Sequence, residues 1–406
     1  MPGTPPEGTP VPQDGSLPAG ALDQLDATLF GIYVHVPFCA TRCGYCDFNT
    51  YTAAELGGGA SRAGYAGSAV AEIAMARKVL GPAAPQVSTV FFGGGTPTLL
   101  PPAALAAILR AIDAEFGLAA GAEVTTEANP ESVDERAVAE LREAGFTRIS
   151  LGMQSAAGHV LAVLDRAHSP GRAEQCVTWA RSAGFEHVSL DLIYGTPGET
   201  AGDWERSVRS AISAGPDHIS AYALIVEEGT RLAARIRRGE LPPPDDDAMA
   251  DRYLAADEML GAAGLRWYEV SNWASGPDAA CHHNALYWTG GNWWGVGPGA
   301  HSHVGGTRWW NVRHPSAYAG RIAAGVSPGQ AREVLSSAER RTERIMLETR
   351  LASGCPVGVL GGAGRRAAAA AVADGLADPV AFEAGRIVLT PAGRLLADAV
   401  IRGLTE

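Results

Sequence analysis

Short apolar runs alternate with longer stretches of helical period through the first half of the chain. Apolar runs bounded by turn residues are typical of buried strands, whereas apolar positions three and four residues apart indicate amphipathic helices. The predicted strands are Gly31–Val36, Thr89–Phe92, Glu123–Glu127, Arg148–Leu151, His187–Ile193 and His218–Leu224. Ala- and Arg-rich helical stretches separate them, so the pattern predicts six βα repeats and a parallel sheet in an α/β fold.

The pattern changes after about residue 225. Pro242–Pro244 and the acidic run after it mark a break, and a helix is expected from there to about Ala263. The aromatic and glycine-rich segment Trp267–Trp310 is too irregular for a plain helix. Near the end, Gly385–Pro391 predicts a strand and Ala392–Val400 a closing helix, which together resemble a winged-helix end. The acidic balance of the chain favours partner docking or a lid role for this end over DNA binding.

These changes in the sequence pattern divide the chain into four predicted parts. Residues 1–26 are rich in proline and poor in large apolar groups, so a flexible leader is expected. Residues 27–228 hold the βα repeats, 229–335 form a middle segment, and 336–406 form the C-terminal α+β part.

Composition narrows the function. The 406 residues carry a formal net charge of −12, which argues against a broad nucleic-acid interface. No Lys or Arg precedes Arg42, and no uncharged apolar stretch is long enough to span a bilayer. A cytoplasmic protein is therefore expected, with peripheral membrane contact left open.

Cys39, Cys43 and Cys46 form a CxxxCxxC cluster directly after the first predicted strand. Three thiolates on one tight loop can hold a metal centre with an open coordination position, whereas a structural zinc site is closed by four ligands. The other cysteines are isolated from one another, which disfavours zinc, and nothing marks the chain as secreted, which disfavours disulfides. These other cysteines are Cys176, Cys281 and Cys355.

The cluster and its position after a strand resemble the radical S-adenosylmethionine superfamily. The resemblance implies that the three cysteines bind three irons of a 4Fe-4S cluster and that the fourth iron binds S-adenosylmethionine. It also implies a partial (β/α)6 barrel, followed here by a C-terminal α+β extension that ends in the winged-helix-like segment.

Residues at the carboxyl ends of the strands are suited to binding, because ligands of parallel sheets lie there. Gly93–Thr98 follows the second strand and Gly195–Gly198 the fifth. No Lys-Ser or Lys-Thr follows Gly93–Gly95, so this segment is a plain turn or a site for a small zwitterion, not a nucleotide phosphate loop. The resemblance assigns Gly94, Gly95 and Thr96 to the methionine part of the ligand.

Polar residues also end the third, fourth and fifth predicted strands or follow them. Taken singly, each of these is equally compatible with a rim or surface position. The resemblance makes four of them contacts to the amino acid and ribose parts of S-adenosylmethionine: Glu127, Gln154, Arg166 and Asp191. It also places Tyr33 and Tyr45 beside the cluster and the adenine, with core packing as the alternative.

Four segments narrow the resemblance to the oxygen-independent coproporphyrinogen III oxidase family: Tyr33–Cys39, Gly93–Thr98, Asp191–Pro197 and Gly297–Ser302. The oxidases carry a fourth cysteine two residues after the third, whereas this chain reads Cys46-Asp47-Phe48. The segment His283–Trp288 has the HNxxYW pattern of HemW-type haem chaperones. Both signs favour binding and transfer of haem over the alternative, radical oxidative decarboxylation of two propionates to vinyls. Cleavage of S-adenosylmethionine is left open.

His283 is the first candidate for a haem ligand, because imidazole is a good axial ligand and large aromatic side chains can cover a flat macrocycle. The neighbouring tryptophans are Trp288, Trp293 and Trp294, and Cys281 is an alternative ligand. Structural roles remain an alternative for His282, His283, His301 and His303. The resemblance implies haem-accepting partners such as respiratory enzymes or iron-storage proteins, and a cluster-dependent homodimer.

Overall fold

The protein is seen in a computed structural model that describes residues 7–25, 28–56, 62–82, 84–166, 169 and 171–406. One sheet of 13 strands organises it, in the order β1-β13-β12-β11-β10-β2-β3-β4-β5-β6-β7-β9-β8. Its centre is six parallel strands: β2 (Phe30–Val36), β3 (Val87–Gly94), β4 (Leu118–Ala128), β5 (Arg148–Gln154), β6 (His187–Tyr194) and β7 (His218–Ala223). The six predicted strands and their parallel pairing are confirmed.

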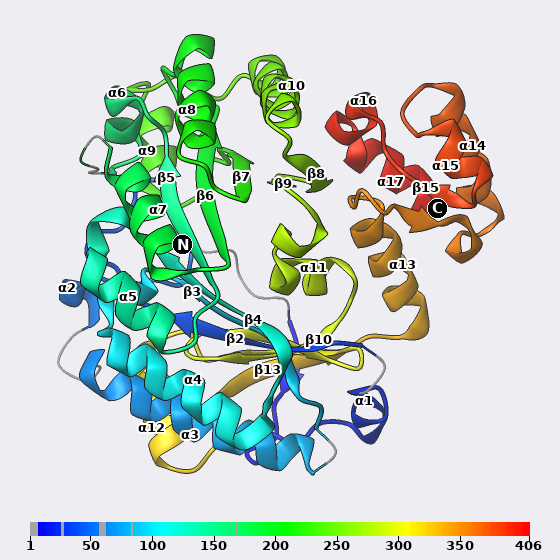
Figure 1. Ribbon diagram of the computed structural model, residues 1–406. Coiled ribbons are helices and arrows are strands. Elements are labelled where there is room, and N and C mark those ends of the chain that lie inside the picture. Colours follow the sequence, from blue (N-terminus) through cyan, green and yellow to red (C-terminus); the bar gives the residue numbers. More distant parts are fainter. Residues whose placement is uncertain (1–6, 26–27, 57–61, 83, 167–168, 170) are drawn as a thin grey trace.

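Helices cover the outer face of this curved sheet (Figure 1). They are α3 (Arg62–Leu80), α4 (Pro102–Phe116), α5 (Glu135–Glu143), α6 (Gly158–Val163), α7 (Arg172–Ala183) and α8 (Ala201–Ser213). The core lies between sheet and helices, where side chains such as Val90, Phe92 and Ile149 are fully buried against Ile108 and Val177. The inner face is left for binding.

The segment that was expected to be irregular extends the sheet at both edges. β10 (Asn292–Val296) lies parallel to β2, and β11 (His301–Val304), β12 (Thr307–Asn311) and β13 (Gly329–Val334) follow in antiparallel order. At the other edge β9 (Asn272–Ala274) pairs with β7 and β8 (Arg266–Glu269) with β9. The remaining α-helices before the C-terminal part, among the described residues, are α2 (Ala53–Leu56), α9 (Arg231–Arg237), α10 (Asp246–Ala262), α11 (His282–Trp288) and α12 (Pro315–Ala323). In Figure 1, α11 lies on the inner side of the sheet.

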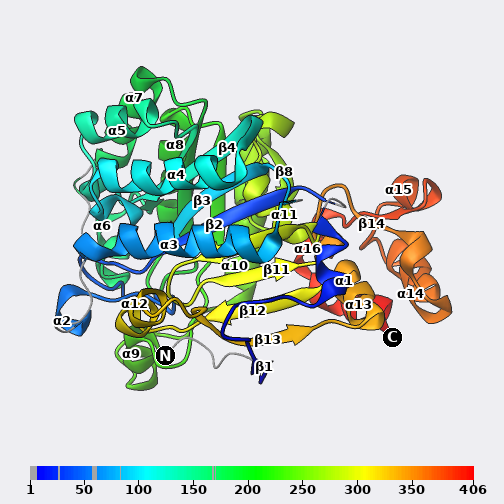
Figure 2. The same ribbon diagram turned by 90° about the horizontal axis from the view of Figure 1, so that it is seen from below.

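The proline-rich start of the chain is ordered, which corrects the expected flexible leader. β1 (Thr9–Pro10) pairs with β13, and α1 (Ala19–Leu22) follows it (Figure 2). Asn292 Nδ2 also donates to the carbonyl of Gln24, 3.0 Å away. Proline is tolerated here because an edge strand has a free side that needs no N–H donor. The expectation fails for residues 7–25, and residues 1–6 and 26 lie outside the described part.

The C-terminal part has a small core of its own. Its elements are α13 (Ser337–Glu348), β14 (Cys355–Pro356), α14 (Gly362–Ala373), α15 (Pro379–Glu383), β15 (Arg386–Ile387), α16 (Pro391–Leu395) and α17 (Ala397–Thr405). The single closing helix that was predicted is broken at Leu396, and β14 and β15 form a two-stranded antiparallel sheet. Arg394 joins this part to the main body through Asp257, 3.0 Å away, and the ring of Trp267. The winged-helix likeness stays a prediction.

Among the described residues, no helix combines the length and the apolar character that crossing a bilayer requires.

Candidate functional site

One cavity of about 810 Å3 opens at the carboxyl ends of the parallel strands and reaches α11 on the inner side. Cofactor and ligand pockets usually measure roughly 300–1,000 Å3. All thirteen residues that the sequence proposed for the site line it: Tyr33, Cys39, Cys43, Tyr45, Cys46, Gly94, Gly95, Thr96, Glu127, Gln154, Arg166, Asp191 and His283. The fold therefore brings the cysteine loop and the HNxxYW helix to the same cavity.

The cysteine loop follows β2, and its thiols lie at the cavity wall. Cys39 is buried, and Cys43 and Cys46 are half-buried. Burial, with a contribution from the neighbouring cysteines, raises the pKa of Cys39 and brings that of Cys46 to about 11. A bound cation would reverse this, because metal binding draws the proton from a coordinating thiol.

The donors that the cysteine loop offers are three thiols. Within the described part of the chain, no three His, Cys, Asp or Glu side chains are placed to hold one metal ion. A zinc ion requires its ligands in one small tetrahedron, whereas each cysteine at a 4Fe-4S cluster binds a different iron. Three thiols on one loop are the donor set that such a cluster requires.

The glycine segment after β3 is fastened to the cysteine loop. Gly95 N–H donates to the carbonyl of Val36 and Thr96 N–H to that of Phe38, both at 2.8 Å. A Cβ added at Gly95 would lie 2.5 Å from the Phe38 carbonyl oxygen, so a side chain would push the two loops apart. Gly94 has φ +108°, a conformation that other residues rarely adopt. These glycines at least position the cysteines.

Two carboxyl groups face the cavity, and at both of them burial outweighs the nearby charge of Arg166. Desolvation raises the pKa of Glu127 to about 8, and the nearby Asp191 adds to the rise. Desolvation also raises the pKa of Asp191, although Ser150 Oγ donates to it at 3.0 Å. Glu127 in turn accepts the N–H of Gly94 at 3.1 Å. Because a nearby cation would lower both pKa values, this wall suits a positively charged ligand.

Several buried polar atoms of the cavity wall have no hydrogen-bond partner among the described residues. They are Thr125 Oγ1, Arg166 Nε, His218 Nδ1 and Asn272 Oδ1, and all four residues line the cavity. An unsatisfied buried polar group costs about 1–3 kcal/mol, so native structures hold few of them. Other unpaired atoms, such as Thr307 Oγ1, lie elsewhere in the described part of the chain, so these four do not single out the cavity.

His283 lines the same cavity, and both of its ring nitrogens have hydrogen-bond partners. Nδ1 is 2.8 Å from Thr89 Oγ1, and Nε2 is 2.8 Å from the Tyr287 hydroxyl. The side chain is buried, which lowers its pKa to about 4, and its ring stacks on Phe91 at 5.4 Å. A metal ion can reach this histidine only after Tyr287 has moved.

The other residues that were expected to surround a haem beside His283 are not gathered there. Trp293 lies on the same side of the sheet, with its ring 4.6 Å from that of Tyr287. Trp294 packs against Trp309 in the core, because neighbouring residues of a strand face opposite sides. Trp288 is not among the described residues that line the cavity. The expected cover of three tryptophans is therefore wrong.

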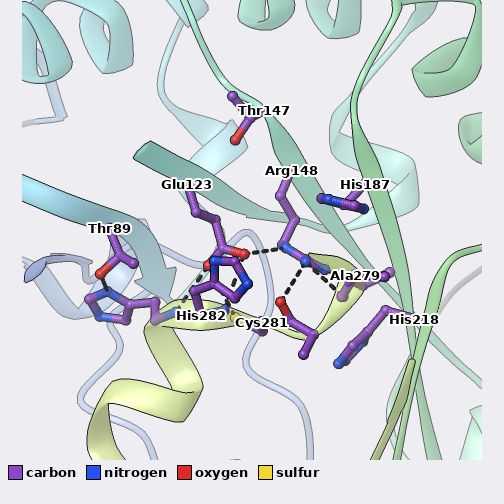
Figure 3. A network of polar contacts seen from close by, with 12 residues as sticks. Thr89, Glu123, Thr147, Arg148, His187, His218, Ala279, Cys281 and His282 are labelled. Carbon is purple, nitrogen blue, oxygen red and sulfur yellow. Dashed lines mark hydrogen bonds and ion pairs between the residues drawn. The ribbon is translucent and has the colours of Figure 1, made fainter. Parts of the chain in front are cut away.

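Sequence analysis missed a buried ion pair that fastens α11 to the sheet (Figure 3). Arg148 Nε lies 2.9 Å from Glu123 Oε2, and Arg148 also donates to the carbonyl of Ala279 at 2.7 Å. Glu123 accepts the backbone N–H groups of His282 and His283 at 3.2 and 3.0 Å. Cys281 directs its thiol at the same carboxylate, 3.7 Å away. The sequence did contain a signal for this ion pair, because two charged residues lie inside predicted buried strands.

Comparison with known proteins adds family relationships to this geometry. Residues 33–211 match the Radical SAM superfamily. A protein of Mycobacterium tuberculosis strain H37Rv named "Heme chaperone HemW" is 55% identical over 375 residues, which are 92% of this chain and 94% of that protein. The protein of the same name from Synechocystis strain PCC 6803 is 36% identical over 79% of this chain and 78% of its own.

The fold has a close solved counterpart. The structure described as "Coproporphyrinogen III oxidase (HemN) from Escherichia coli is a Radical SAM enzyme" superimposes with a TM-score of 0.80, over 97% of this chain and 94% of its own. The sequence identity is 20%, so this match supports the fold and carries no argument about activity.

Proposed function

Because the chain belongs to the HemW family within the radical SAM superfamily, we propose that it is a haem chaperone. It binds haem and passes it to acceptor proteins, and it carries a 4Fe-4S cluster with exchangeable S-adenosylmethionine. The observation that supports this most directly is the single cavity that joins the cysteine loop to the HNxxYW helix.

Cys39, Cys43 and Cys46 would hold the cluster through three of its irons. When bound, the cluster offers its fourth iron to S-adenosylmethionine and can supply one electron. Phe48 stands where the oxidases have a fourth cysteine, and its side chain is 60% exposed and has no atom that could bind iron. The protein's own part is to hold the three thiols on one loop against Gly95 and Thr96.

The remaining cavity residues fit S-adenosylmethionine by charge. Glu127 and Asp191 would suit its ammonium and sulfonium groups, and the guanidinium of Arg166 would suit its carboxylate. Gln154, Tyr33 and Tyr45 would contact the ribose and adenine, and Gly94, Gly95 and Thr96 would contact the methionine part.

His283 is proposed as a haem ligand that becomes available when Tyr287 releases Nε2. Cys281 is the alternative on the same helix start, but its thiol is buried against Glu123, and burial raises its pKa far above the ordinary value. The histidine is the better ligand because neutral imidazole binds iron without losing a proton.

Coproporphyrinogen III oxidation is the alternative function. It would require a 5'-deoxyadenosyl radical to reach two propionate side chains in this cavity. Family membership and Phe48 in Cys46-Asp47-Phe48 favour the chaperone. Turnover of coproporphyrinogen III to vinyl products would reverse the choice.

The partners follow from the proposed role. We propose a cytoplasmic protein that delivers haem to proteins such as respiratory enzymes or iron-storage proteins, by peripheral membrane contact where the acceptor is membrane-bound, and that dimerises when cluster-loaded. The net charge of −12 supports the absence of a nucleic-acid partner.

An anaerobic titration of haem into cluster-loaded protein, followed by addition of apomyoglobin, tests the proposal. We expect one haem per chain, its transfer to apomyoglobin, and no vinyl product from coproporphyrinogen III. Cys46→Ala should lose most of the iron, whereas Cys176→Ala, a buried cysteine of α7 outside the cavity, should keep it. Rapid porphyrinogen turnover, or the lack of stoichiometric haem binding, would contradict the proposal.

A further inference from the structure

Two residues of the cavity have an unusual backbone conformation. Among the described residues other than glycine, Gln154 and Asp165 are the two with positive φ, at +64° and +55°. Both line the cavity. A side chain makes this left-handed conformation less stable than the right-handed one, and such strain is concentrated at functional sites. Gln154 already has a place in the proposed function, whereas Asp165 has none.

Asp165 stands where a helix usually ends in glycine. Arg166 N–H donates to the carbonyl of Leu161 at 2.9 Å. Asp165 N–H donates to that of Ala162 at 3.3 Å, which completes a Schellman motif at the end of α6. Glycine is the usual residue at the left-handed position of this motif, because it has no Cβ. Aspartate is less favourable there, so its carboxylate points to contacts that glycine could not make.

The carboxylate of Asp165 contacts both α9 and the cysteine loop. Its Oδ2 lies 2.8 Å from Nη2 of Arg231, the first residue of α9. A Cβ added at Gly44 would collide with the same oxygen, so this oxygen packs directly against the backbone between Cys43 and Tyr45. Glycine at position 44 therefore gives the carboxylate its place beside the loop.

The cysteine loop is fastened to both helices at Gly44. Gly44 N–H donates to the carbonyl of Leu164 at 3.3 Å, and the Gly44 carbonyl accepts the N–H of Leu232 at 2.8 Å. The end of α6, the start of α9 and the loop therefore form one hydrogen-bonded unit. The ion pair of Asp165 and Arg231 joins the two helices within it.

The same turn directs Arg166 into the cavity. A Cβ added at Gly152 of β5 would lie 2.9 Å from Arg166 Nη2 and 2.8 Å from Gln154 Nε2. The guanidinium and the amide therefore converge beside the bare backbone of Gly152. Asp165 thus contacts the cysteine loop and directly precedes the arginine of the proposed ligand site.

We infer that Asp165 is a positioning residue that couples the cysteine loop to Arg166. Its ion pair with Arg231 holds the left-handed turn, the loop at Gly44 and the direction of Arg166 in one arrangement. The inference rests on the proposed function, in which the loop holds the cluster and Arg166 binds the carboxylate of S-adenosylmethionine. Tight binding requires that the side chains of a site are held in place, so releasing the turn should weaken binding of this ligand.

Arg231 separates positioning from direct contact. It is not among the described residues that line the cavity, and its side chain is 64% exposed. Removing its charge therefore breaks the ion pair with Asp165 without removing a contact to a ligand in the cavity. Two residues that act through one ion pair should also have non-additive effects on binding.

S-adenosylmethionine is titrated anaerobically into the cluster-loaded full chain by calorimetry, with wild type, Asp165→Asn, Arg231→Gln and the double variant. We expect each single variant to weaken binding roughly fivefold or more, and the double variant to bind no more weakly than the single ones. Hydrogen exchange at the amide of Gly44 should accelerate in all three. Glu205→Gln, at an exposed ion pair of α8, is the control and should keep the wild-type affinity.

Asp165→Gly separates the carboxylate from the backbone. Glycine adopts positive φ without strain, so this variant should be at least as stable to urea as Asp165→Asn. We still expect it to lose the affinity, because the ion pair is gone. The electron paramagnetic resonance spectrum of the dithionite-reduced cluster should then need a higher concentration of S-adenosylmethionine to reach its ligand-bound form.

Wild-type affinity in Asp165→Asn and Asp165→Gly would overturn the inference and leave the proposed function standing. Weakened binding in Asp165→Asn with wild-type affinity in Arg231→Gln would also overturn it, because Asp165 would then act by direct contact. Cluster-loaded wild type that binds no S-adenosylmethionine would overturn the proposed cofactor site and this inference together.

Discussion

The hydroxyl of Tyr287 lies 2.8 Å from Nε2 of His283, one helical turn earlier in α11. A neutral imidazole has one donor and one acceptor nitrogen, and with Thr89 at Nδ1 both are in use. The HNxxYW segment thus contains both a haem ligand candidate and the residue that closes it.

Removing this hydroxyl should open His283. We expect Tyr287→Phe to bind haem more tightly than wild type and to show a histidine-ligated Soret band, because Nε2 of His283 is then free. Loss of one buried hydrogen bond should lower the free energy of unfolding by about 1 kcal/mol. Equal haem affinities of Tyr287→Phe and wild type would show that Tyr287 does not control access to His283.

Arg166 provides a test of the S-adenosylmethionine site. Its Nε is buried without a partner, and its charge lies near Tyr45 and Cys43. We expect Arg166→Gln to weaken S-adenosylmethionine binding by roughly 10- to 100-fold in calorimetric titrations, since hydrogen bonds to charged groups contribute about 1.5–3 kcal/mol. Arg136→Gln, at an exposed ion pair on α5, is the control and should leave the affinity unchanged. Unchanged affinity of Arg166→Gln would remove Arg166 from the site.

The buried ion pair of Glu123 and Arg148 should contribute more to the stability of α11 than a single ion pair usually does. Arg148→Met leaves the Glu123 carboxylate buried and unpaired, which should cost about 3–5 kcal/mol in the free energy of unfolding. The double variant Glu123→Gln/Arg148→Met should lose less than the sum of the single losses, and urea denaturation measures the difference. Hydrogen exchange at His282 and His283 should accelerate in the single variants, because Glu123 accepts their N–H groups. Additive losses would show that the two residues are not coupled.

Glu72 predicts how stability depends on pH. This buried carboxyl lies between α3 and the glycine segment before β11 and accepts from Gly297 N–H, Asn311 and Tyr318. Burial, outweighing these hydrogen bonds, raises its pKa to about 7 from an ordinary 4.5. Between these values the folded state holds more protons than the unfolded state, so stability should fall as pH rises from 4.5 to 7 and level off above it.

The shift in Glu72 corresponds to a loss on the order of 3 kcal/mol over that pH range. Urea denaturation at pH 5 and pH 8 measures it. At pH 5, Glu72→Gln should be less stable than wild type, because the amide has one acceptor oxygen for three donors. Between pH 5 and pH 8, it should lose less stability than wild type loses. Glu140→Gln, which removes an exposed carboxylate, should keep the wild-type pH dependence. If Glu72→Gln kept the pH dependence of wild-type stability, Glu72 would not be the group that causes it.

Much of the central fold and of the cofactor site is encoded locally. β5 is predicted by its own apolar run, and the order of β2 to β7 follows because successive βα units place successive strands side by side. Cys39 follows one predicted strand of that sheet and Glu127 ends another, so both lie at the same edge. The sequence alone determined these positions because neighbouring residues and a repeated connection specify them.

The long-range pairings were decided only by the tertiary structure. No local pattern indicates that β10 lies beside β2, about 260 residues earlier in the chain, or that Thr9 and Pro10 complete the far edge of the sheet. The same holds for the closure of His283 by Thr89. Whether a side chain is free or bonded depends on which distant groups the packed sheet brings within hydrogen-bond distance, and that is a property of the whole fold.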